Sequence, residues 1–227
     1  MASEWCVVKY NEFNKLSKII KSNMNNNKPI VEKTAKYVTN LFEIKIPNWA
    51  VYHDLKHTTD TVKGCNEIGR GQSIGHEDLE ILTISAWFHD TGYFESPDKH
   101  EEASAELAKN FLEKNSYSSS KIKDVIDCII ATKIANKPKN ILEKIICDSD
   151  LISLGQKNYH KLNDQLKSEI ELREGKKIKE ISWLKRSLKF LLAHNYYTEY
   201  AQINFNSQLK KNISELQDQI NKLLNKV

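Results

Sequence analysis

Apolar residues recur along most of the chain at the spacing of one helix face. The clearest run consists of Ile122, Val125, Ile126, Ile129 and Ile130, at positions i, i+3, i+4, i+7 and i+8. No segment shows the strict alternation of apolar and polar residues that is typical of a strand. The pattern therefore predicts an all-α fold, organised as a single helical bundle.

The same spacing predicts several further helices. They are expected near residues 30–43, 52–68, 79–87, 100–114, 139–148, 157–173 and 180–194. The chain has only 7 Gly and 4 Pro, so long flexible linkers are not expected. Residues 69–75 are predicted to be a loop; this segment lacks the Lys-Ser/Thr pair of a phosphate-binding loop.

Loop-forming residues at 23–28 suggest how the chain divides. We expect an N-terminal helix and loop over residues 1–27, a main domain over 28–200 and an amphipathic helix over 201–227. This last segment carries a heptad-like stripe, which consists of Leu209, Ile213, Leu216, Ile220 and Leu223. Two interpretations stay open: a helix packed on the domain, or a short coiled coil that joins two copies as a homodimer.

The composition is that of ordinary globular protein, with 40% hydrophobic and 28% charged residues. The net charge of +4 is spread along the chain. It suits a small anionic substrate and indicates no specific nucleic-acid partner. Neither a membrane segment nor a signal peptide is expected. The four cysteines form no C-x-x-C pair, and Cys128 and Cys147 fall in apolar helical patterns, so a reduced, cytoplasmic setting is expected.

Four residues of metal-ligand type stand in order along the chain: His57, the adjacent pair His89 and Asp90, and Asp150. Two imidazoles and two carboxylates suit a divalent metal and leave coordination positions open for water and substrate. His89 and Asp90 lie about 100° apart on an ideal helix, so they converge only where the helix ends. Gly92 offers such an end.

A further histidine stands one helical turn before His57. His53 and His57 are four residues apart and share a face if both are helical. The sequence therefore predicts that both imidazoles point into one cavity.

The order of these motifs resembles the HD superfamily of metal-dependent phosphohydrolases over about residues 50–155. The motifs are Tyr-His-x-x-x-His-Thr at 52–58, Trp-Phe-His-Asp-Thr-Gly at 87–92 and Asp-x-Asp-Leu at 148–151. Three other segments, at 100–105, 129–133 and 190–198, are similar to HD domains fused to membrane segments in bacterial proteins associated with cyclic-nucleotide defence signalling.

The resemblance implies a role for each ligand position. His57, His89, Asp90 and Asp150 would hold one divalent ion from the set Mn, Mg, Ni, Fe and Zn. Asp148 is the competing carboxylate. Asp90 or Asp150 would orient the attacking water. His53 would be the general acid that protonates the leaving oxygen, or else a histidine that supports the site.

Three cationic or titratable residues are predicted to bind the substrate phosphate. Lys133 would contact the phosphate and assist catalysis, and its charge would disfavour a second metal. His100 would contact the phosphate, complete a second metal site or cap the helix that starts there. Arg186 is a further candidate for substrate binding, and the alternative for Lys133 is a surface lysine.

The resemblance predicts a phosphohydrolase or phosphodiesterase that acts on a nucleotide, cyclic nucleotide or dinucleotide by metal-activated water. The alternative is a module that binds metal and nucleotide as a sensor with little turnover. Oxygenase chemistry, as in di-iron proteins of HD type, would need two irons and more ligands. A purely structural helical adaptor would leave the motif set as coincidence.

Overall fold

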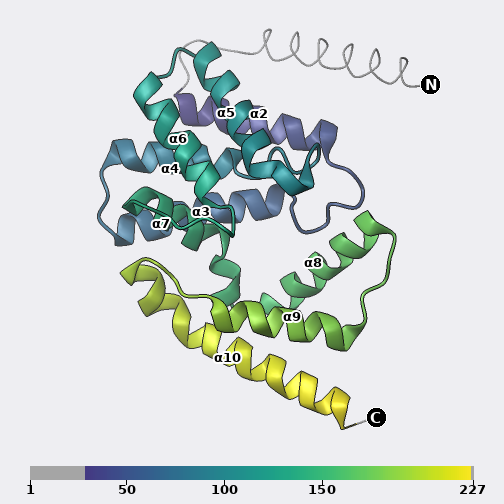
Figure 1. Cartoon of the computed structure of the whole chain (residues 1–227). Helices are drawn as coiled ribbons and strands as arrows, with labels where there is room; N and C mark the ends of the chain where they lie inside the picture. The colour runs from purple at the N-terminus through teal and green to yellow at the C-terminus, as the bar shows by residue number, and fades with distance from the viewer. Residues whose placement is uncertain (1–28, 226–227) are drawn as a thin grey trace, which may run out of the picture.

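The computed structural model describes residues 29–225 of the chain. Within this range the chain forms nine α-helices and two short 3₁₀ helices, without any β-strand (Figure 1). The α-helices are α2 (Ile30–Lys45), α3 (Leu55–Gly71), α4 (His76–Phe88), α5 (His100–Lys114), α6 (Ser119–Ala131), α7 (Ile141–Asp150), α8 (Tyr159–Glu174), α9 (Glu180–Ala193) and α10 (Glu199–Leu224). The 3₁₀ helices are η1 (Pro97–Lys99) and η2 (Ile152–Gly155). The all-α prediction is confirmed.

Helix α4 lies between two apolar cores. Its Ile84 and Phe88 belong to a core shared with α2, α5 and α6, whereas its Leu82 and Ala86 belong to a second core. That second core also contains residues of α3, α7, α9 and α10. A helix that is apolar on every side has to be surrounded by other elements. The end of α4, where His89 and Asp90 follow, is therefore brought to the centre of the bundle.

Helices α8, α9 and α10 lie together on one side of the bundle, coloured green to yellow in Figure 1. Leu184 and Leu191 of α9 pack into the same core as Leu209 and Leu216 of α10. The heptad-like stripe thus faces the chain's own core, with Ile220 also buried there. The predicted homodimer remains a prediction, and the predicted N-terminal helix lies outside the described residues.

The helix ends agree with the predicted ones within three residues throughout the described part of the chain. The loop predicted for residues 69–75 is shorter, because α3 continues to Gly71. A Cβ on Gly71 would lie only 2.0 Å from the Tyr200 ring. This glycine therefore permits close packing of α10 against α3 and does not mark a turn.

The three described cysteines are reduced and buried, as predicted for Cys128 and Cys147; the third is Cys65. In the described part of the chain, no helix combines the length and the apolar character needed to cross a bilayer.

Candidate metal centre

The end of α4 places two of the predicted ligands. Helix α4 stops at Phe88, and His89 and Asp90 form the turn that follows, so the prediction that the pair lies at a helix end is confirmed. The Nδ1 atom of His89 donates a hydrogen bond to the Ala86 carbonyl at 2.8 Å. This bond fixes the tautomer and leaves the Nε2 lone pair free to bind a metal.

Gly92 has a different role from the predicted helix cap. It is not left-handed; among described glycines only Gly175 is. A Cβ on Gly92 would lie 2.6 Å from both the Ala103 Cβ and the His100 carbonyl oxygen, and its N–H donates to Ser104 Oγ at 2.8 Å. The glycine therefore lets the start of α5 approach the turn that carries His89 and Asp90.

The start of α3 places the two histidines of the first motif. Asp54 is the N-cap, and its side chain accepts a hydrogen bond from the His57 N–H at 2.8 Å. His57 therefore lies in the first turn of the helix, whereas His53 precedes the helix. The prediction that both share a helix face is wrong, because Asp54 caps the helix between them. Their rings still meet, with centroids 5.7 Å apart.

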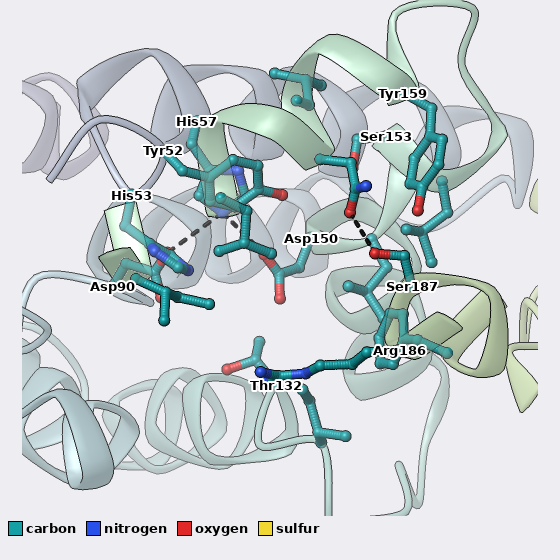
Figure 2. A pocket seen from close by; sticks show the side chains of 18 of the residues that line it. Tyr52, His53, His57, Asp90, Thr132, Asp150, Ser153, Tyr159, Arg186 and Ser187 are labelled. Atoms are coloured by element: carbon teal, nitrogen blue, oxygen red, sulfur yellow. Dashed lines mark hydrogen bonds and ion pairs between the residues drawn. The ribbon is translucent and has the colours of Figure 1, made fainter. Parts of the chain in front are cut away.

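Asp150 is the last residue of α7, and its neighbour Asp148 has a separate task. Both carboxylate oxygens of Asp148 accept hydrogen bonds, from the backbone N–H of Tyr197 and from the backbone and hydroxyl of Thr198. Asp148 thus ties α7 to the segment before α10. Asp150 Oδ1 instead lies 3.1 Å from His57 Nε2, near which Figure 2 shows it, and 3.3 Å from His89 Nε2. The structure therefore brings Asp150, rather than Asp148, to the cluster.

The four predicted ligand residues form one cluster. Ligand atoms of His57, His89, Asp90 and Asp150 all lie within 4.8 Å of one another. Each histidine Nε2 lies close to both carboxylates: 3.2 and 3.1 Å for His57, and 3.0 and 3.3 Å for His89. Three segments that are distant in the sequence, namely the start of α3, the turn after α4 and the end of α7, therefore bring their donor atoms to one place.

The charges in this cluster are strongly coupled. Burial by itself lowers the pKa of His57, but the adjacent Asp150 and Asp90 carboxylates raise this pKa to about 9. Burial also opposes the charged form of Asp90, yet the His89 charge holds the pKa of Asp90 well below its usual range. Carboxylates that attract protons to buried imidazoles equally attract a divalent cation.

The surroundings of Asp90 Oδ2 indicate whether these residues fit a metal ion. Asp90 Oδ2 is buried and lacks a hydrogen-bond partner, although it faces both histidine Nε2 atoms. Because His89 Nδ1 donates to the Ala86 carbonyl, Nε2 is the nitrogen that faces the same place, and it can bind an ion that displaces its proton. Two carboxylate oxygens and two imidazole nitrogens at one point match the ligands of a divalent transition metal or Mg²⁺. The residues fit such an ion.

The cluster opens onto a cavity of about 560 Å³ (Figure 2). His57, Asp90 and Asp150 line one end of it, and residues of α8 and α9 line the other. The volume lies in the range of cavities that hold drug-sized ligands.

Residues 54–155 match the HD domain family. The chain carries an HD domain. A crystal structure of a predicted HD superfamily hydrolase from an uncultured Thermotogales bacterium has a similar fold, with a TM-score of 0.54 at 17% identity. The likeness covers 90% of this chain and 97% of that one. At this identity it establishes the fold alone, and no curated protein matches the chain. The family match over residues 54–155 confirms the predicted HD superfamily, whereas the similarity to HD domains of defence-signalling proteins remains a prediction.

His53, immediately before the matched residues 54–155, is held from two sides. Its Nδ1 forms a 2.5 Å hydrogen bond with Glu169 Oε1, and its ring packs on Tyr93 with centroids 4.1 Å apart. Sequence analysis missed Glu169 and Tyr93. Nothing local distinguishes Glu169 from the other acidic residues of α8, so only the tertiary contact reveals it.

His100 begins α5 beside the metal-type ligands. Its Nδ1 donates to the Pro97 carbonyl at 2.8 Å, which leaves Nε2 facing Asp90 Oδ1 at 3.6 Å and Glu101 Oε1 at 3.5 Å. His100 and Glu101 both line the cavity. The structure thus brings His100 to the cavity, and its predicted phosphate contact remains a prediction.

Lys133 lies differently from its predicted position. Its Nζ pairs with Glu102 at 2.6 Å, and the neighbours Thr132 and Ile134 line the cavity while Lys133 does not. This placement does not support the predicted phosphate contact. It also removes the argument that a lysine charge disfavours a second ion.

Arg186 of α9 lines the cavity and has no acidic partner among the described residues. Its guanidinium lies over the Trp183 ring, 5.7 Å from the centroid. In Figure 2 the side chain extends into the cavity toward the side where Thr132 lies. The structure thus brings Arg186 into the cavity lining, whereas Lys133 lies outside the lining.

Proposed function

We propose that this HD domain is a phosphoric ester hydrolase that acts on a nucleotide, with the phosphate at the metal-type cluster. One observation carries the proposal: four ligand residues converge at one end of a cavity whose other end is a mostly apolar wall. The cavity is too large for a phosphate group alone. The substrate therefore has an organic body that the wall contacts.

The far wall favours an uncharged, partly apolar body. It includes Leu162, Leu166 and Ile170 of α8 and Phe190 of α9. Its charged residues are Arg186 and Lys189, and no acidic side chain of α8 or α9 lines the cavity. An anionic ester with a flat or apolar body suits such a wall, because apolar groups gain by burial and positive charges attract phosphate.

A small polar group interrupts this wall. Ser187 Oγ donates to Asn163 Oδ1 at 2.9 Å, and both side chains are buried (Figure 2). The Tyr159 hydroxyl lies beside Ser187. Neutral donors and acceptors set in an apolar surface are the groups that recognise the edge of a nucleobase. This polar group is why we favour a nucleotide over a lipid phosphate.

Each residue near the cluster receives a role in the proposal. His57, His89, Asp90 and Asp150 would hold the divalent ion, which when bound activates water and neutralises phosphate charge. Arg186 and His100 bind phosphate oxygens. His53 gives its proton to the leaving oxygen. Lys133 receives no substrate contact.

The test is a metal-dependent screen of phosphate esters. Purified protein is stripped of metal and assayed with Mn²⁺, Mg²⁺ or Ni²⁺ against nucleoside monophosphates, triphosphates, cyclic nucleotides and dinucleotides. We expect phosphate or nucleoside release that requires the ion. Metal and nucleotide binding without turnover would instead assign a sensor, and absence of both would refute the proposal.

A further inference from the structure

Glu169 is a buried carboxylate that pairs with no lysine or arginine within residues 29–225. Its side chain has no solvent exposure, and it accepts hydrogen bonds from the backbone N–H groups of Tyr52 at 2.8 Å and His53 at 2.9 Å. The third bond is the 2.5 Å contact with His53 Nδ1. Three interactions from residues more than a hundred positions away thus converge on one carboxylate.

The charge state of Glu169 is consistent with this arrangement. Burial by itself raises its pKa, but the hydrogen bonds and the charge of His53 lower the pKa below its usual range. A carboxylate without exposure stays ionised only if donors surround it. The three donors come from the segment immediately before α3, which also contains the N-cap of the helix that carries His57.

The contacts of His53 leave it one free nitrogen. Glu169 occupies Nδ1, and Tyr93 covers a ring face. Arg173 Nη1, one turn after Glu169 on α8, donates to the Tyr93 hydroxyl at 2.9 Å and so holds Tyr93 in place. His53 lines the cavity. Its Nε2 is therefore the nitrogen available to a substrate.

We propose that Glu169 is a positioning residue that fixes the His53 ring, so that Nε2–H points at the leaving oxygen of the phosphate ester. This inference rests on the proposed hydrolysis. As water oxygen bonds to phosphorus, the bond from phosphorus to the leaving oxygen breaks and its electron pair stays on that oxygen. The leaving oxygen takes the Nε2 proton, while Glu169 keeps the Nδ1 proton in place. The attacking water loses one proton to solvent, and solvent later returns a proton to Nε2, so that the products are the alcohol and the phosphate.

The experiment uses leaving groups of different stability. Glu169→Gln keeps the size of the side chain and removes its charge. The variant is assayed on the p-nitrophenyl and methyl esters of thymidine 5′-phosphate. A methoxide needs a proton to leave, whereas p-nitrophenolate leaves as a stable anion. Replacing a residue that acts through the general acid should therefore lower the hydrolysis rate of the methyl ester and leave that of the p-nitrophenyl ester unchanged.

We expect kcat for the methyl ester to fall about tenfold to a hundredfold with little change in KM, and kcat for the p-nitrophenyl ester to stay within about twofold. The matched control is Glu171→Gln on the same helix, whose carboxylate pairs with Lys177 and does not line the cavity; both rates should hold. Equal losses on both esters, or no loss on either, would overturn the inference.

Two further measurements test the inference, and the second does not depend on the folding of Glu169→Gln. Glu169→Gln added to His53→Ala should cause no further loss on the methyl ester; an additive loss contradicts the inference. Nitrogen-15 spectra of histidine-labelled, unsubstituted protein, assigned with His53→Ala, should show His53 protonated on Nδ1. An unprotonated Nδ1 contradicts the inference. The spectra need no turnover, so they separate this inference from the proposed function.

Discussion

The two ends of the cavity differ in origin and in chemistry. The metal-type cluster lies within residues 54–155, which match the HD domain family, and consists of histidines and aspartates. The opposite wall comes largely from α8 and α9, outside that match, and is mostly apolar. Under the proposed function, the part that matches the family would carry out the reaction, and the later helices would decide which ester fits. Glu169 is the exception, because it reaches from α8 to His53.

The largest effect should come from the cluster itself. Replacing His89 and Asp90 with Ala removes two of four ligands, so we expect metal binding and hydrolysis to fall below detection. Metal content and phosphate release measure this, and circular dichroism should show nearly unchanged helix. His76→Ala is the control, since His76 is exposed and lies outside the cavity. Hydrolysis by the double variant at the parent rate would mean that the reaction occurs elsewhere.

Arg186 should show the next largest effect. Arg186→Gln removes a cation that faces the cavity, and a charge-assisted phosphate contact is worth about tenfold to a hundredfold in binding. We expect KM to rise by that factor and kcat to change less. Lys185→Gln removes a neighbouring exposed charge that does not line the cavity. If both variants raised KM equally, Arg186 would act through the overall positive charge of this surface and not through a direct contact with the phosphate.

A smaller and more selective effect is expected at Asn163. Asn163→Leu removes the acceptor of Ser187 and places an apolar group at the far wall. We expect KM for a nucleoside 5′-phosphate to rise about fivefold to tenfold, since one neutral hydrogen bond is worth about 1 kcal/mol. Ribose 5-phosphate, which has no base, should show an unchanged KM. A parallel rise for both compounds would place the base elsewhere. Thermal unfolding checks the fold.

The smallest effect is expected at Lys133. Lys133→Ala should leave KM and kcat within about twofold, because the ammonium pairs with Glu102 at the surface and does not line the cavity. Steady-state kinetics on the best substrate from the screen measure this. A rise in KM comparable with that of Arg186→Gln would restore the phosphate contact predicted from the sequence.

The helices were predictable because each depends on local pattern. The i, i+3, i+4 spacing around Ile122 and Ile129 is visible in the sequence, and α6 follows it. The exception lies at Asp54, where a capping side chain starts α3 three residues later than predicted. Whether Asp54 caps the helix or continues it depends on the conformation of this one residue. The spacing of apolar residues over a whole helix does not reveal that choice.

The cluster was predictable for a different reason. Few residue types bind a divalent ion, and here they stand in an order that resembles a known family. His57, His89 and Asp150 could therefore be selected from the sequence before their distances were known. The choice of Asp150 over Asp148 agrees with the structure, where the Asp148 carboxylate accepts hydrogen bonds from the backbone N–H and the hydroxyl of Thr198.

The sequence by itself determined the helical fold and the four ligand-type residues. Helix periodicity and the choice of metal-binding residue types both depend on residues that lie close together in the sequence. The tertiary structure alone decided what surrounds them. The bond from Glu169 to His53 spans 116 residues, and the pair of Lys133 with Glu102 spans 31. Such contacts depend on how whole helices pack, and no local pattern specifies which charged side chain meets which partner.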